Sequence, residues 1–245
     1  MPIQYLSGLA AKHRSGQANL HIGVILTLVA GALNAGGFLA IGQYTSHMTG
    51  MVSALADQIV LRNFALAGIA AVSWIAFVTG AAVTALLVNY LRRSDSSHLY
   101  AVPLLLEASL ILLFGAFGAT LDKHELADVS LAVITLCFTM GLQNALITKI
   151  SRAEIRTTHV TGLTTDLGIE IGKLLYWNRR RPDDRRAPVR ANKNKLRIHA
   201  ILIASFLAGG IAGALGFYYV GFVSTVPLAL ALAAIAIAPA LGTAA

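Results

Sequence analysis

The chain has 245 residues, of which 56% are hydrophobic and only 12% are charged. A soluble domain carries about 25% charged residues, so this composition excludes a water-exposed globular protein and indicates a membrane protein. The formal net charge is +8, yet the segment 177–197 alone holds nine Lys/Arg against two acidic residues. The remainder is nearly neutral, so we expect no nucleic-acid partner.

Six apolar stretches follow one another along the chain, and each reaches the roughly 20 residues that a helix needs to cross a bilayer. They are 20–41, 64–91, 99–121, 129–150, 198–220 and 221–241. The predicted fold class is therefore an all-α polytopic membrane protein with six transmembrane helices and the lipid bilayer as its surroundings. Six spans place residues 1–19, the basic cluster at 177–197 and both termini on the cytoplasmic side, as the positive-inside rule requires.

A polar hexapeptide occurs twice. Residues 45–50 read TSHMTG and residues 157–162 read TTHVTG, and an asparagine precedes each copy, Asn34 and Asn144. We therefore divide the membrane domain into repeat 1 at 20–121 and repeat 2 at 129–241. With three spans in each half, the second half is inverted relative to the first, as in many secondary transporters.

A short helical segment follows each hexapeptide. With about 15 residues, these segments are too short to span a bilayer easily, so each is a re-entrant or an interfacial helix. Thr45 and Thr157 are predicted to be their N-caps, which would leave a positive dipole end at each motif. Acidic residues in these segments, Asp57, Asp166 and Glu170, are predicted to lie on solvated faces.

The polar residues of the motifs and spans form the candidate substrate-binding site. Histidine titrates near neutral pH and could carry protons, or it could bond a backbone carbonyl where a helix breaks. An acid in mid-span needs a partner or a proton, and the motif histidines are our candidate partners for Glu107. The candidate residues are Thr45, His47, Thr49, Gly50, Thr157, His159, Thr161, Gly162, Glu107, Asn34 and Asn144.

The amides Asn34, Gln143 and Asn144 are predicted to form hydrogen bonds between helices, with a place along a substrate path as the alternative. The single cysteine, Cys137, permits no intrachain disulfide and no thiolate metal cluster, and we interpret it as a small core residue. Glycines at 209, 210, 213 and 216 predict close helix packing, within the monomer or across a homodimer.

The motifs resemble those of a known family. Residues 32–38, 45–50, 141–145 and 157–168 are similar to the YoaK family, also called domain of unknown function 1275. The resemblance covers about 20–241. It implies a bacterial inner-membrane protein with six spans, and it supplies no established activity or catalytic residue.

These patterns favour a small-solute permease or channel-like transporter with its site at the paired motifs and with His47, His159 and Glu107 coupled to protons. The solute would be small and polar or anionic. The alternative is a structural or partner-binding membrane protein that docks through its basic cytoplasmic loop. No nucleophile–base set, phosphate loop or metal-ligand array occurs, so we expect neither an enzyme nor a bound cofactor or metal.

Overall fold

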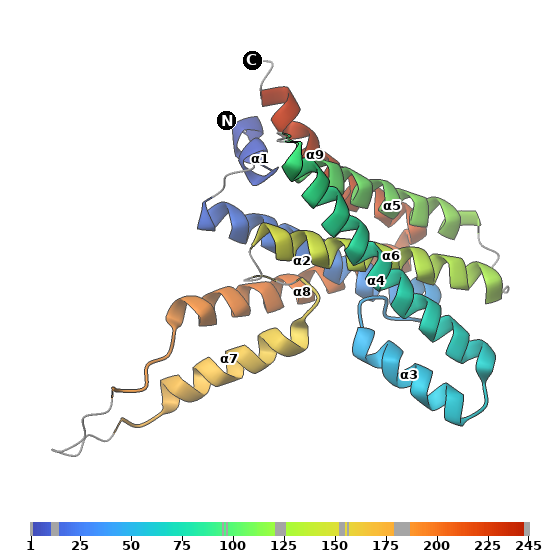
Figure 1. The fold of residues 1–245 in the computed structure, drawn as a ribbon, viewed down its shortest axis with the longest axis horizontal. Coiled ribbons are helices and arrows are strands. Elements are labelled where there is room, and N and C mark those ends of the chain that lie inside the picture. Colours follow the sequence, from blue (N-terminus) through green and yellow to red (C-terminus); the bar gives the residue numbers. More distant parts are fainter. Residues whose placement is uncertain are drawn as a thin grey trace.

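The structure is a computed structural model that describes residues 2–10, 15–94, 96, 98–120, 126–151, 155, 157–178 and 187–242. Every regular element in these residues is a helix (Figure 1). The elements are α1 (Pro2–Ala10), α2 (Gly16–Ile41), α3 (Met48–Val60), α4 (Phe64–Arg93), α5 (Ala101–Thr120), α6 (Leu126–Ile150), α7 (Val160–Leu175), α8 (Lys193–Tyr219), the 3-10 turn η1 (Gly221–Ser224) and α9 (Thr225–Gly242).

Six of the described helices are long and apolar enough to cross a membrane, which confirms the six predicted spans: α2, α4, α5, α6, α8 and α9. The motif helices α3 and α7 have only 13 and 16 residues and are not among them. Residues 179–186 of the predicted basic loop lie outside the described residues, as do Lys12 and Arg14.

Proline positions agree with these helix boundaries. Pro103 and Pro227 lie in the first turns of α5 and α9, where a missing N–H removes no intrahelical hydrogen bond. Pro239 lies close to the end of α9. The apolar spans are therefore free of proline in their central turns, so their backbone hydrogen bonds are satisfied internally, as a bilayer requires.

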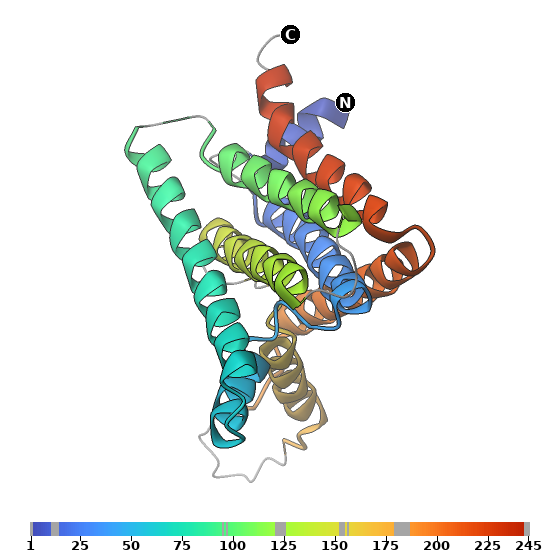
Figure 2. The same cartoon turned by 90° about the vertical axis from the view of Figure 1, so that its right-hand side faces the viewer.

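The short N-terminal helix α1 packs against α9. Its residues Leu9 and Ala10 are buried in the main hydrophobic cluster. Figure 2 shows α1 beside the last helix, with the two ends of the chain close together. The sequence predicted only a cytoplasmic extension over residues 1–19, because nine residues are too few to show a clear span or an isolated stable helix.

Helices α2 and α8 run parallel and touch through their backbones. A Cβ on Gly31 would collide with the carbonyl oxygen of Phe206, and a Cβ on Gly209 would collide with that of Leu28. Further along, Gly213 lies against the backbone of Ala32. The predicted close packing of these glycines therefore occurs within the monomer.

Helices α4 and α6 repeat this contact at corresponding residues. Gly141 lies against the carbonyl oxygen of Phe77, and Gly80 lies against that of Phe138. The hydroxyl of Thr84 donates to the carbonyl of Leu142 at 3.1 Å. The four helices thus form two closely packed pairs, α2 with α8 and α4 with α6.

Helices α2 and α6 lie antiparallel. Gly23 faces Ile147 near the start of α2, while Gly37 faces Leu136 near its end. Between them, the Gln143 amide donates to the carbonyl of Leu26 at 2.9 Å, which confirms its predicted role between helices. Cys137 is fully buried, as predicted for a core residue.

Replacing Gly80 by alanine should destabilise the protein, because the new methyl group would push α4 away from α6. Overpacking of this kind typically costs about 1–3 kcal/mol. The measurement is the thermal unfolding midpoint of the detergent-purified protein.

Gly68→Ala on the same helix is the matched control, since nothing lies within 4 Å of the position of its Cβ. Alanine is also the better helix former, so this variant should keep or slightly raise the midpoint. Equal midpoints for the two variants would contradict the close approach of α4 and α6.

Candidate functional site

Asn34 positions the first motif. Gly42 ends α2 in the left-handed conformation with φ of 74°, which turns the chain back along the helix. The backbone N–H and the hydroxyl of Ser46 then both donate to Asn34 Oδ1, at 3.2 and 2.8 Å. Asn34 lies about two turns before the end of α2, so the motif begins about 10 Å inward from that end.

Asn144 positions the second motif in the same way. Its Oδ1 accepts from the Thr157 hydroxyl at 3.2 Å and from the Thr158 N–H at 3.4 Å. Its Nδ2 donates to the Thr158 hydroxyl and to the Met140 carbonyl. Asn34 and Asn144 therefore fasten each motif to the span that precedes it, instead of joining two spanning helices as predicted.

The motif helices begin two residues later than predicted. Their N-cap residues are His47 and His159, so the predicted N-caps Thr45 and Thr157 are wrong. Thr45 and Thr157 lie two residues before these N-caps, and both are fully buried. The hydroxyl of Thr45 has no hydrogen-bond partner among the described residues.

Both motif histidines are exposed, and neither side chain caps its helix. Backbone N–H groups in the first turns of α3 and α7 therefore lack a side-chain acceptor from these N-cap residues. Free N–H groups at a helix start attract anions and polar oxygen atoms. Thr49 and Thr161 in these turns are also exposed.

The two copies differ at their glycines. The ring of His47 lies directly over Gly50, so that a Cβ there would collide with the imidazole. At Gly162 nothing lies within 4 Å of the corresponding position, so the ring of His159 is placed differently. A side chain at position 50 would displace the imidazole of His47, whereas one at position 162 would meet open space.

Glu107 is fully buried on α5, and neither carboxyl oxygen has a hydrogen-bond partner among the described residues. Neither motif histidine therefore bonds it, and our choice of His47 or His159 as its partner was wrong. The polar group beside it is the side chain of Gln143, on α6. Figure 2 shows α5 in the upper half of the view and α3 and α7 at the bottom.

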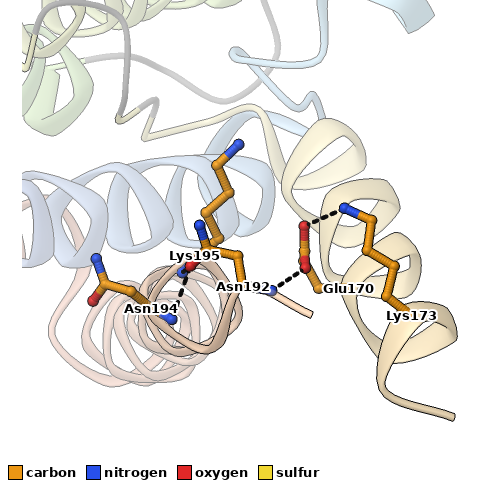
Figure 3. Close-up of polar contacts among 5 residues, drawn as sticks. All are labelled: Glu170, Lys173, Asn192, Asn194 and Lys195. Atoms are coloured by element: carbon orange, nitrogen blue, oxygen red, sulfur yellow. Dashed lines mark hydrogen bonds and ion pairs between the residues drawn. The ribbon is translucent and has the colours of Figure 1, made fainter. Parts of the chain in front are cut away.

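Glu170 on α7 is buried, so the prediction of a solvated position was wrong, whereas Asp57 and Asp166 are exposed as predicted. Its carboxylate accepts from Lys173 Nζ at 2.8 Å and from the backbone N–H of Asn192 at 2.6 Å (Figure 3). These two bonds hold the pKa of Glu170 below its ordinary value. We call this contact between α7 and the start of α8 the Glu170 latch.

Four residues of these contacts were not predicted from the sequence: Ser46, Thr158, Lys173 and Asn192. Ser46 and Thr158 both occupy the second position of the motif. The signal in the sequence was that both copies carry a hydroxyl side chain at this position. The side chain of Asn192 caps α8, because its Oδ1 accepts from the backbone N–H groups of Asn194 and Lys195. Its contact with Glu170 joins residues far apart in sequence, which no local pattern reveals.

Comparison with known proteins agrees with this architecture. A model of the family described as "Protein of unknown function (DUF1275)" matches residues 22–238. The chain belongs to this family. One relative, "UPF0700 transmembrane protein YoaK" of Bacillus subtilis (strain 168), is 24% identical over 210 residues, which cover 84% of this chain and 88% of the relative. No solved structure matches the chain.

The Glu170 latch should make stability depend on pH. Because the folded-state pKa of Glu170 is lowered, its stabilisation is present above the unfolded pKa of about 4.3 and is lost as pH falls through the lower folded value. Glu170→Gln should lower the unfolding midpoint at neutral pH, and its difference from the unaltered protein should shrink in acid. Asp166→Asn on the same helix is the control and should show neither effect.

Asn144→Ala should destabilise the protein more than Asn34→Ala, because Asn144 makes four bonds and Asn34 accepts two. Side-chain hydrogen bonds in membrane proteins contribute about 0.6–2 kcal/mol. Chemical unfolding in detergent measures both losses. Asn63→Ala, which removes an exposed bond to Gln58, is the control and should cost less than either.

Proposed function

We propose that this protein is a small-solute permease or channel-like transporter built from two inverted three-helix repeats. Repeat 1 comprises α2 to α5 and repeat 2 comprises α6 to α9. The crosswise glycine contacts at corresponding residues support this division. So does the antiparallel packing of α2 on α6, since equivalent helices in inverted repeats run in opposite directions.

The observation that carries the proposal is the placement of the motif helices. Figure 1 shows α3 and α7 starting near the middle of the molecule and running outward to opposite sides. Each start is held inward of the preceding helix end by Asn34 or Asn144. We interpret α3 and α7 as re-entrant half-helices whose positive ends approach the solute from opposite sides of the membrane.

The chemistry of these helix starts suits a small polar or anionic solute. Each start offers uncapped backbone N–H groups, one exposed imidazole and one exposed hydroxyl, from Thr49 or Thr161. Each imidazole also offers a ring N–H that can donate a hydrogen bond to the solute. Proton coupling through Glu107 stays a prediction, because its carboxyl oxygens have no hydrogen bond to either motif histidine.

The membrane is proposed to be the bacterial inner membrane, with both termini in the cytoplasm. The basic residues between α7 and α8 support this orientation. The relative YoaK, which aligns with 84% of this chain, is a transmembrane protein of the bacterium Bacillus subtilis.

Flux through reconstituted protein tests the proposal. Proteoliposomes would be mixed with formate, acetate, nitrate, urea or glycerol in separate runs, and solute entry followed by stopped-flow light scattering. We expect at least one solute to enter faster than in protein-free liposomes, and the variant with His47→Ala and His159→Ala to lose most of this increase.

His21→Ala is the matched control, because His21 is exposed on α2 and forms a hydrogen bond with the exposed Tyr5, away from both motifs in the sequence. Its flux should equal that of the unaltered protein. If none of these solutes enters faster than in protein-free liposomes, or if the double variant conducts as well as the control, the proposed site is wrong.

A further inference from the structure

We infer that the junction of α7 and α8 binds anionic phospholipid headgroups in the leaflet at which α8 begins. We call this surface the basic–aromatic junction. Its residues are Tyr176, Trp177, Arg190, Lys193, Lys195 and Arg197. The inference concerns the lipid around the protein and does not depend on transport.

Two contacts hold the junction together. The side chain of Asn178 pairs with the backbone of Val189 through two hydrogen bonds of 2.8 Å each. The Glu170 latch then ties α7 to Asn192 at the start of α8 (Figure 3). Residues on both sides of 179–186 are therefore fixed next to one another, and the aromatic end of α7 lies beside the basic start of α8.

The junction carries an excess of positive charge. Its four basic side chains, Arg190, Lys193, Lys195 and Arg197, are all exposed. α8 contains no acidic residue, and α7 contains two. Of these, Glu170 is buried against Lys173, which leaves Asp166 as the exposed acid of α7. Basic residues beside a membrane attract anionic lipids.

A lipid surface fits better than an acidic protein because of where the residues lie. Lys193, Lys195 and Arg197 belong to the first turns of a helix that continues as an apolar span, so they enter the bilayer at the level of its headgroups. Tyr176 and Trp177 are 58% and 83% exposed. Such aromatic side chains prefer the membrane interface, and the exposed Leu174 and Leu175 before them favour contact with acyl chains.

Tryptophan fluorescence tests the inference directly, because the chain has two tryptophans, Trp74 and Trp177. The Trp74→Phe protein would be placed in mixed vesicles of phosphatidylcholine and phosphatidylglycerol in which one lipid at a time carries brominated chains that quench fluorescence. At low salt, we expect the apparent affinity of phosphatidylglycerol near Trp177 to exceed that of phosphatidylcholine by roughly threefold to tenfold. The preference should shrink at high salt because of screening.

The Trp177→Phe protein is the matched control, because its remaining Trp74 lies in the middle of α4 and should show no lipid preference. Replacing the four basic residues by glutamine in the Trp74→Phe protein should abolish the preference while the unfolding midpoint shows that the fold is kept.

Equal quenching by the two lipids would overturn the inference, and so would a preference that survives the four glutamine substitutions. Absence of lipid preference combined with binding of polyglutamate would assign the junction to an acidic protein partner instead. Flux through the protein is a separate measurement, so failure of the proposed transport leaves this test intact.

Discussion

The contact on which the rest of the structure depends is the close approach of helix backbones at glycines. In a bilayer, apolar side chains gain little by leaving lipid for another helix, so packing and polar contacts must hold helices together. Gly31 and Gly209 bring α2 and α8 together, and Gly80 and Gly141 do the same for α4 and α6. Any larger residue at these positions would meet a backbone carbonyl, which cannot move without displacing its helix.

This packing links segments far apart in the chain, because α2 contacts α8 and α4 contacts α6. Neither the first three spans nor the last three can therefore bury their glycine faces alone. Fixing α2 and α6 also fixes Asn34 and Asn144, which in turn place the motif starts inward of the helix ends. The positions of His47 and His159 thus follow from backbone contacts far from either histidine.

Much of the fold could be predicted because a bilayer sets the length and composition of each spanning helix. The six spans and the short motif helices follow from that constraint alone. The site was predicted less well. Thr45 and Thr157 fit the N-cap pattern because threonine is common there, but both are fully buried before their helices begin. Glu170 looked solvated because acids on amphipathic helices usually are, yet it binds the start of α8.

By itself, the sequence determined the number of spans, the duplication, the two histidine motifs and the asymmetric placement of basic residues. These are local or periodic properties, and physical constraints on single segments are enough to interpret them. Only the tertiary structure decided that Glu107 lies beside Gln143 without a bond to either motif histidine, that the glycines join α2 to α8 and α4 to α6, and that Glu170 ties α7 to α8. Such contacts join residues distant in the chain, and their geometry depends on how whole helices cross.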